Sequence, residues 1–400
     1  MIEARQFVEA ARERGFHWYA GVPCSYLTPF INYVLQDRSL RYVSMANEGD
    51  AVALIAGIAL GGAPGAPASQ HGRGIAMMQN SGLGNAVSPL TSLTWTFRLP
   101  VLLIVTWRGQ PGVPDEPQHA LMGPVTPDML RTMEIPWELF PTEGEAIGPV
   151  LDRAVAHMTE TGRPYALLMQ KGTVAPYALA PSEIVNGAGP GTFAAALVQD
   201  YGGDAVDRPS RRAALQEVIA RTPSDSSVVL ASTGFCGREL YALEDRPNQL
   251  YMVGSMGCVL PLALGLALAR PDLRVLAVDG DGAALMRLGA LATAGAYGPP
   301  NLRHLLLDNG VHDSTGGQAT VSDHVAFGAV AAACSYADAL DTDRLESIGT
   351  WLSAPDLRGP RFARLRIRSG TPDGLPRPSM TPFEVKRRLM QHIAAAAGAA

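Results

Sequence analysis

Residues 274–318 have the sequence RVLAVDGDGAALMRLGALATAGAYGPPNLRHLLLDNGVHDSTGGQ, and no other segment of the chain indicates its fold so clearly. An apolar strand, Arg274–Val278, is followed by a glycine-rich turn, a helical pattern over Ala283–Gly295 and a second apolar strand, Leu302–Asp308. Continuously apolar strands are typical of parallel sheets that are covered on both faces. The segment therefore predicts a strand–helix–strand unit of a doubly wound α/β sheet.

Polar groups follow both strands. The first strand runs into Asp279-Gly280-Asp281-Gly282, and the second is followed by Asn309 and Gly310. Open α/β sheets bind ligands at the carboxyl ends of their strands. A carboxylate and an amide oxygen meeting there suit a hard cation such as Mg²⁺, and glycines allow a bulky anion to approach the backbone. Either motif alone is also an ordinary strand-end turn.

The combination of the two motifs is more specific, because 26 residues separate Gly282 from Asn309. This arrangement resembles the cofactor motif of thiamine-diphosphate (ThDP) enzymes. The resemblance implies ThDP and Mg²⁺ as cofactors, with Asp281, Asn309 and the backbone carbonyl of Val311 as metal ligands. Most of that superfamily has Asn-Asn where this chain has Asp308-Asn309, which we interpret as a subfamily variation. Motifs for nicotinamide (G-x-G-x-x-G) and P-loop nucleotides (G-x-x-x-x-G-K-[ST]) do not occur.

The resemblance also implies further cofactor contacts. Met256 would support the bent cofactor, although core packing is an equally ordinary role for a methionine. Glu48 would bind the pyrimidine N1′ and move a proton there; it lies between the expected strand Arg41–Met45 and an apolar helix. Alone, Glu48 would be interpreted as an acidic residue that favours a helix start. The remaining expected cofactor contacts are Thr233, Gly254, Ser255, Gly280, Gly282, Ser314 and Thr315.

The same alternation of strands and helices occurs in two blocks. We expect two doubly wound parallel-sheet domains of the ThDP-binding fold: a pyrimidine-binding domain (residues 1–180) and a diphosphate-binding domain (residues 211–400). The Gly-, Ala- and Pro-rich residues 181–210 are expected to be a linker. The other expected strands are Ile75–Gln79, Pro100–Thr106, Tyr165–Gln170, Ser227–Ala231, Gln249–Val253 and Phe362–Arg366. The other expected helices are Ser25–Gln36, Glu48–Leu60, Leu83–Thr94, Glu143–Glu160, Arg211–Arg221, Gly257–Ala269, Val325–Ala333, Asp343–Leu352 and Pro382–Ala396, with an amphipathic pattern over residues 1–16.

Composition restricts the class of protein. Hydrophobic residues make up 47% of the chain, which excludes a disordered protein, and the net charge of -5 gives no sign of nucleic-acid binding. Neither a secretory signal nor an apolar run long enough for a membrane span is recognisable, so a cytoplasmic protein is expected. The four cysteines are scattered, which favours reduced thiols. Charged residues are only 17%, consistent with buried subunit contacts in a homodimer or homotetramer.

The absence of a central third domain narrows the resemblance to the ThDP decarboxylases that act on phosphonopyruvate and sulfopyruvate. The segments that carry this resemblance are GVPCSYLTPF (21–30), ANEGDAVALIAG (46–57), MQNSGLGN (78–85), LTSLT (90–94), RGQPGVPDEPQH (108–119), GSMG (254–257), GDG (280–282) and DNGVHDSTGGQ (308–318). The resemblance implies a carboxy-lyase of phosphonate biosynthesis that converts 3-phosphonopyruvate to phosphonoacetaldehyde and CO₂. Fusion of both domains in one chain favours phosphonopyruvate over sulfopyruvate.

An anionic substrate needs polar and cationic contacts. Arg108 is the expected bidentate clamp, and His119 and His312 are expected to contact the phosphonate or transfer protons. Ser25, Ser81 and Asn85 are the further expected substrate contacts. A solvated loop charge remains the alternative for Arg108, and Cys24 lacks a base that would make it a nucleophile.

Two other classes of function stay open. A non-enzymatic cofactor-fold subunit would be expected to lack Glu48 or the Asp281 and Asn309 pair, and all three are present. An acetolactate-type ThDP carboligase commonly carries the central domain that is missing here. Substrate assays would discriminate between these enzymes.

Overall fold

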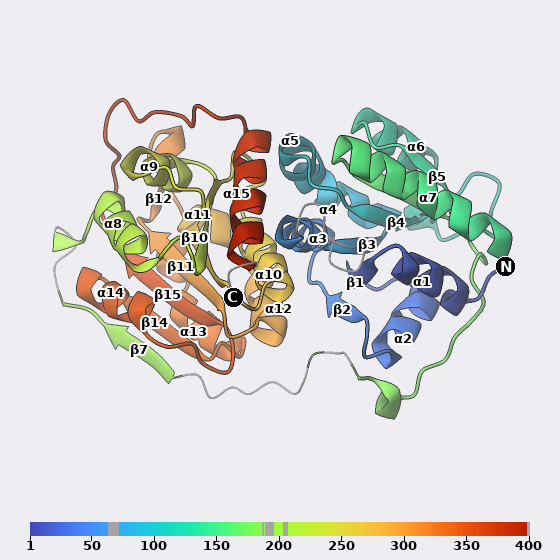
Figure 1. Ribbon diagram of the computed structural model, residues 1–400, viewed down its shortest axis with the longest axis horizontal. Helices are drawn as coiled ribbons and strands as arrows, with labels where there is room; N and C mark the ends of the chain where they lie inside the picture. The colour runs from blue at the N-terminus through green and yellow to red at the C-terminus, as the bar shows by residue number, and fades with distance from the viewer. Residues whose placement is uncertain (63–71, 186–187, 189–195, 203–206, 398–400) are drawn as a thin grey trace. The chain divides into compact units, whose positions relative to one another are not determined.

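The computed structural model describes residues 1–62, 72–185, 188, 196–202 and 207–397, and the chain divides into two units, Met1–Ala188 and Gly189–Ala400 (Figure 1). Each unit is built on its own parallel sheet, with strand order β2-β1-β3-β4-β6-β5 in the first and β7-β14-β15-β11-β10-β8-β9 in the second. Both sheets are covered by helices on their two faces, as the apolar strands predict. The expected fold class of two doubly wound parallel-sheet domains is confirmed.

The first unit alternates strands and helices along the chain. Its strands are β1 (Phe16–Gly21), β2 (Arg41–Ser44), β3 (Arg73–Gln79), β4 (Leu102–Thr106), β5 (Trp137–Leu139) and β6 (Tyr165–Met169). Its helices are α1 (Ala4–Glu13), α2 (Thr28–Gln36), α3 (Glu48–Gly61), α4 (Leu83–Ser88), α5 (Trp95–Phe97), α6 (Met122–Thr132) and α7 (Gly144–Thr161). The one helix expected over Leu83–Thr94 is in fact α4 followed by a π-helical turn from Pro89 to Thr94, because a proline cannot donate the backbone hydrogen bond that continues an α-helix.

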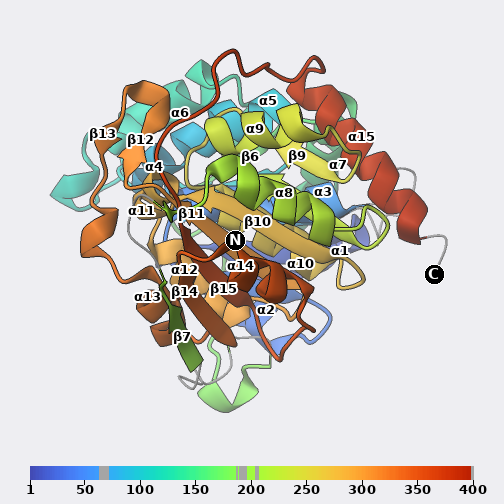
Figure 2. The same cartoon turned by 90° about the vertical axis from the view of Figure 1, so that its left-hand side faces the viewer.

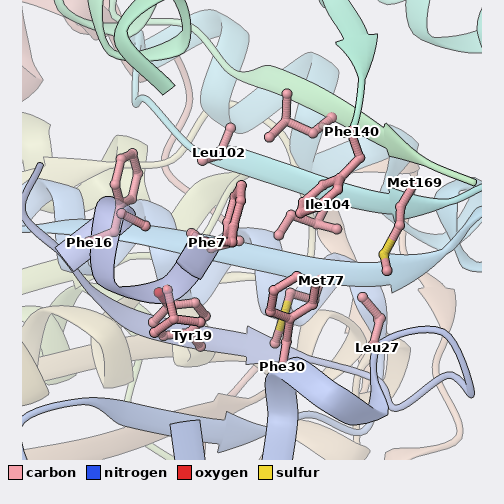
Figure 3. Packing of buried hydrophobic residues seen from close by; sticks show 14 of the residues in the cluster. Phe7, Phe16, Tyr19, Leu27, Phe30, Met77, Leu102, Ile104, Phe140 and Met169 are labelled. Carbon is pink, nitrogen blue, oxygen red and sulfur yellow. The ribbon is translucent and has the colours of Figure 1, made fainter. Parts of the chain in front are cut away.

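The core of the first unit lies between its sheet and the layer that contains α1, α2 and α7. Phe7, Phe30 and Phe140 contact one another there, with ring centroids 4.6–5.5 Å apart (Figure 3). Helix α3 lies on the other side of the sheet and is buried all round after Glu48. Burial on every side explains why α3 is apolar without an amphipathic pattern.

The second unit has a longer sheet. Its strands are β7 (Ala196–Asp200), β8 (Ser227–Ala231), β9 (Gln249–Tyr251), β10 (Arg274–Gly280), β11 (Leu302–Asp308), β14 (Asp338–Thr342) and β15 (Arg361–Arg366), with a separate hairpin of β12 (Val311–His312) and β13 (Gln318–Ala319). Its helices are α8 (Arg211–Arg221), α9 (Phe235–Leu243), α10 (Val259–Ala269), α11 (Asp281–Met286), α12 (Gly289–Tyr297), α13 (Phe327–Ala333), α14 (Leu345–Ser353) and α15 (Pro382–Ala397).

The segment expected to be a linker, residues 181–210, contains a strand of this sheet. Strand β7 pairs in parallel with β14 and forms one edge of the sheet (Figure 2). The expectation of a linker is therefore wrong for Ala196–Asp200, because a short edge strand needs only one partner and little apolar patterning. Within the expected linker, residues 186–187, 189–195 and 203–206 lie outside the described part of the chain.

Both sheets change winding direction at a point that bears on function. In the first sheet β1 lies between β2 and β3, and in the second β8 lies between β9 and β10. Consecutive strands run to opposite sides from these points, which opens a crevice at the carboxyl ends of the strands. None of the helices in the described residues is long and apolar enough to cross a membrane.

Candidate active site

The switch point of the second sheet places Asp281 at the start of α11, directly after β10. Its side chain is 3% exposed, and Oδ2 accepts a 2.5 Å hydrogen bond from Oγ1 of Thr320. Burial raises the pKa of the Asp281 carboxyl and the nearby Asp308 carboxylate adds to this, while the hydrogen bond from Thr320 opposes it. Burial disfavours the ionised form of this carboxyl, and a bound cation would stabilise that form.

Asn309 follows the neighbouring strand β11, and its amide group is held in one orientation. Nδ2 donates a 2.7 Å hydrogen bond to Oδ2 of Asp313. The same Oδ2 accepts a 2.7 Å hydrogen bond from Nη2 of Arg211, whose Nη1 donates to Oε1 of Glu239 at 2.7 Å. The amide nitrogen is engaged by this network, and Oδ1 accepts a longer hydrogen bond of 3.3 Å from the Val311 amide, so the amide oxygen keeps acceptor capacity for a ligand.

The residues predicted as metal ligands offer oxygen donors, which are the kind that Mg²⁺ prefers. Among the described residues no group of three or more His, Cys, Asp or Glu side chains is arranged to hold a metal. The predicted set is one carboxylate from Asp281, one amide oxygen from Asn309 and the carbonyl of Val311. Mg²⁺ accepts such a small set of protein oxygens and completes its octahedron with waters and phosphates.

Three other predicted residues converge on the start of α11. A Cβ atom added at Gly282 would lie 2.4 Å from Cε1 of His312 and 3.3 Å from Cε of Met256. A side chain at this position would displace both neighbours, so Gly282 is required for close packing. At Gly280 an added Cβ would meet nothing within 4 Å, so that face of the turn is open.

The remaining predicted cofactor contacts of the second unit have different surroundings. Ser255 is buried and has a positive φ of 51°, in the tight turn after β9. Thr233 and Ser314 line one pocket. The Thr315 hydroxyl is engaged within its own loop, because it donates to Oε1 of Gln318 at 2.8 Å.

In the first unit, Glu48 is the first residue of α3. Its Oε2 accepts a 2.8 Å hydrogen bond from Nδ2 of Asn85, and a Cβ at Gly82 would lie 2.1 Å from Oε1. Asn47 caps the helix, its side chain accepting from the Gly49 amide at 2.8 Å. Asn85, which the sequence predicts as a substrate contact, thus bonds directly to Glu48.

A polar cluster marks the switch point of the first sheet. Cys24, after β1, has its Sγ 3.4 Å from Oε1 of Gln79 and 3.4 Å from Oγ1 of Thr106. Nε2 of Gln79 donates to Oγ of Ser81 at 2.5 Å. Ser25 is exposed beside this cluster. These groups lie at the carboxyl ends of β1, β3 and β4, where a ligand of this fold is expected.

Arg108 has a partner that the sequence analysis missed. Its Nε and Nη2 donate to the two carboxylate oxygens of Asp115 at 2.8 and 2.6 Å, and its guanidinium lies 5.1 Å from the ring centre of Tyr26. This pairing lowers the pKa of Asp115 and raises that of Arg108. The charge expected to clamp a substrate is therefore already balanced, and the pair closes the loop between β4 and α6.

His119 lies at the end of this loop. It is 5% exposed, and its Nδ1 is buried without a hydrogen-bond partner in the described part of the chain. Gly109, with a φ of 67°, packs against the His119 carbonyl, which a Cβ would approach to 2.0 Å. A buried imidazole nitrogen without a hydrogen-bond partner costs folding free energy. Such a group is consistent with a contact to a ligand.

Several residues of the site were missed from the sequence. Asp313 lies only four residues after Asn309, inside a segment already quoted, and this spacing was the available signal. Arg211 and Thr320 carry no comparable local signal. They reach the site only because α8 and the loop after β13 pack beside it.

Comparisons with known proteins agree with this geometry. The family model described as "Thiamine pyrophosphate enzyme, C-terminal TPP binding domain" matches residues 233–345. The phosphonopyruvate decarboxylases of Streptomyces viridochromogenes and Streptomyces hygroscopicus are each 44% identical to this chain, over 98% of it and 95% and 94% of their own lengths. The sulfopyruvate decarboxylase of Methanosarcina acetivorans is 26% identical over 96% of both chains.

A solved structure supports the fold independently. An X-ray structure of a putative thiamin diphosphate-dependent enzyme from Mycobacterium smegmatis matches with a TM-score of 0.66, covering 92% of this chain and all of that one, at 14% identity. At this identity the likeness shows the fold alone.

Proposed function

This chain belongs to the phosphonopyruvate decarboxylase family of ThDP enzymes, and we propose that it converts 3-phosphonopyruvate to phosphonoacetaldehyde and CO₂ with ThDP and Mg²⁺. The observation that carries this proposal is the 44% identity to phosphonopyruvate decarboxylases over nearly the whole chain. The reaction is a non-oxidative decarboxylation and a step of phosphonate biosynthesis.

Active sites are shared between subunits in this proposal, and each end of the cofactor is assigned to one of the two units. The second unit would bind the diphosphate: Asp281, Asn309 and the Val311 carbonyl would hold Mg²⁺, and Gly280 and Gly282 would admit the phosphates. The first unit, with Glu48, would bind the aminopyrimidine. When bound, ThDP supplies the nucleophilic carbon and the electron sink for breaking the carbon–carbon bond.

Glu48 holds and moves a proton at the pyrimidine N1′. The hydrogen bond from Asn85 to Oε2 and the close approach of Gly82 to Oε1 restrict the carboxylate to one orientation. A carboxylate that is already oriented loses less conformational entropy when it reaches the geometry for proton transfer. Asn85 therefore serves catalysis through Glu48 and not through the substrate.

The substrate contacts are assigned to the polar groups of both switch points. Ser25, Ser81 and His119 come from the first unit, and His312 comes from the second. His119 and His312 are the two candidates for proton transfer to product. Arg108 is paired with Asp115 and holds the conformation of its loop. We therefore expect Arg108 to affect the substrate mainly by positioning this loop.

Sulfopyruvate is the second candidate substrate, because a sulfopyruvate decarboxylase matches nearly the full chain. The test offers 3-phosphonopyruvate, 3-sulfopyruvate and pyruvate to purified protein with ThDP and Mg²⁺, and measures CO₂ and aldehyde. We expect phosphonopyruvate to have the highest kcat/KM. Preference for sulfopyruvate would select the second candidate, and turnover of pyruvate alone would reject both.

A homodimer or homotetramer is part of the proposal. A charged fraction of 17% is low for a chain of this size, and subunit contacts would bury the uncharged surface. Light scattering after gel filtration should give at least twice the mass of 42.3 kDa. A stable, active monomer would contradict this.

A further inference from the structure

We propose that a pocket of about 670 Å³ in the first unit binds a free aromatic amino acid, whose carboxylate contacts Arg5 and whose ammonium group contacts Glu3. This volume is in the range of small-molecule sites, about 300–1,000 Å³. The pocket belongs to the layer of α1 and α2, which lie side by side, whereas α3 with Glu48 covers the other face of the sheet (Figure 1). The site is therefore separate from Glu48, and it does not depend on which reaction the protein catalyses.

Polar side chains of both helices line the pocket. Arg5, Glu9 and Arg12 are spaced i, i+4 and i+7 along α1, so they share one face of that helix. Tyr33 and Asp37, in the last turn of α2, line the pocket from the second helix. The pocket is thus a groove between two neighbouring helices with polar groups on both sides.

The charged groups of the lining leave one charge of each sign without an ion pair. Arg12 pairs with Glu9 and, at 3.3 Å, with Asp37. Arg5 and Glu3 are exposed, and neither forms an ion pair with any described residue. A zwitterion matches both of these charges, whereas a simple anion or a simple cation would match only one of them.

Two tyrosine rings form an aromatic wall of the pocket. The rings of Tyr33 and Tyr177 are in edge-to-face contact, with their centroids 5.7 Å apart. The Tyr33 hydroxyl donates to Oε1 of Glu9 at 2.7 Å, and the Tyr177 hydroxyl accepts a hydrogen bond from Nε2 of Gln36. Nδ2 of Asn32 also donates to the Tyr177 carbonyl at 2.8 Å. Because both rings are held in place before binding, an aromatic ligand can contact them at little cost in conformational entropy.

The charge of Arg5 acts close to this wall. Burial and the hydrogen bond to Glu9 raise the pKa of the Tyr33 hydroxyl to about 12, and the Arg5 charge opposes this rise. One amino acid can therefore place its carboxylate at Arg5 and its ring at the tyrosines. Behind the lining, the hydroxyl of Tyr19 is buried without a hydrogen-bond partner among the described residues. The polar groups of this region thus do not satisfy one another completely.

The test is calorimetric titration of L-phenylalanine into the full chain. 2-Phenylethylamine and phenylacetate are the matched ligands, because the first lacks the carboxylate and the second lacks the ammonium group. We expect saturable binding of phenylalanine and an affinity about tenfold or more lower for each matched ligand, since each loses one charge-assisted contact. The proposal fails if phenylalanine shows no saturable binding, or if either matched ligand binds with equal affinity.

Two variants test the assigned contacts. Arg5→Gln should lower the affinity for phenylalanine about tenfold or more and leave that for 2-phenylethylamine unchanged, because this ligand has no carboxylate. Glu3→Gln should lower the affinity for phenylalanine and leave that for phenylacetate unchanged. Arg38→Gln is the control, since Arg38 is an exposed arginine of the same unit outside the pocket lining. Unchanged phenylalanine affinity in Arg5→Gln, or an equal loss in Arg38→Gln, would reject the proposed contact.

The phenylalanine titration is repeated with saturating ThDP and Mg²⁺. We expect the same affinity, because the pocket and Glu48 are on opposite sides of the sheet. Displacement of phenylalanine by the cofactor would show that it binds in the active site, and would overturn the proposal. Decarboxylation of 3-phosphonopyruvate is assayed separately, so a failure of this site and a failure of the proposed reaction are distinguishable.

Discussion

Nδ2 of Asn309 donates a 2.7 Å hydrogen bond to Oδ2 of Asp313, and this contact orients the amide that we propose as a magnesium ligand. Asp313 is in turn held by Arg211 at 2.7 Å, and Arg211 is 6% exposed. Groups that orient a metal ligand in this way commonly affect affinity as much as the ligands do.

Asp313→Asn should therefore weaken Mg²⁺ binding by roughly 10- to 100-fold. The variant allows the Asn309 amide to turn and removes one of the charges that Arg211 neutralises. Affinity would be measured as the Mg²⁺ concentration needed for ThDP binding, followed by circular dichroism. Asp323→Asn is the matched control, because Asp323 lies beyond β13 in the same unit and its side chain is 79% exposed. Equal Mg²⁺ affinity in both variants would contradict the orienting role.

Glu48→Gln should retain ThDP binding and lose activity by at least roughly 100-fold, because general acid–base catalysis contributes about 10²–10⁴. Asn85→Ala should have an intermediate effect that lowers kcat more than it raises KM, since Asn85 acts through Glu48. Steady-state kinetics with a direct ThDP titration would separate the two effects. A Glu48→Gln enzyme of normal activity would reject the N1′ role.

Arg364→Met should destabilise the second unit strongly. Arg364 Nε donates to Oδ2 of Asp308 at 2.7 Å, and both side chains are 3% exposed. Removing one partner of such a pair costs about 3–5 kcal/mol of unfolding free energy, because the other charge stays buried. Denaturant unfolding would measure this. Arg366→Met is the control, since its closest carboxylate, on Asp323, is 3.6 Å away and exposed; a similar loss in both variants would count against the pair.

Mg²⁺ affinity should fall as the pH is lowered. The pKa of Asp281 is raised by burial, so the folded protein binds this proton more tightly than the unfolded chain does. A proton and the metal compete for the same carboxylate. Because the pKa is raised, this competition continues at pH values above those at which an aspartate usually titrates. ThDP binding would be titrated with Mg²⁺ from pH 5 to 8. An affinity independent of pH over this range would be inconsistent with Asp281 as the ligand.

The same raised pKa has a consequence for stability without metal. Its contribution to stability is present below the unfolded pKa of the aspartate and is lost as the pH rises through the folded value. Saturating Mg²⁺ and ThDP should reverse this loss, because the cation stabilises the ionised carboxylate. Thermal unfolding at several pH values, with and without the cofactors, measures both effects.

The sequence predicted some strands well and missed others for identifiable reasons. Strands β10 and β11 are continuously apolar and were recognised. Strand β14 has the sequence DALDT, and the burial of its Asp341 is compensated by Nη1 of Arg364, which lies 3.3 Å from Oδ2. Strand β1, FHWYAG, carries polar and aromatic residues that do not resemble a buried strand. Local patterns cannot reveal burial that a distant partner makes possible.

The sequence by itself determined the α/β class, the positions of Asp281 and Asn309 at strand ends, and the expectation of Glu48 at a helix start. Hydrophobic periodicity and short-range motifs carry this information, because they depend on residues that are close along the chain. Only the tertiary structure decided which charges are neutralised and which atoms are oriented. Arg364 lies 56 residues from Asp308, and Arg211 lies 102 from Asp313. Such pairs form only when separate strands and helices pack together, so their energies depend on burial and distance and not on local sequence.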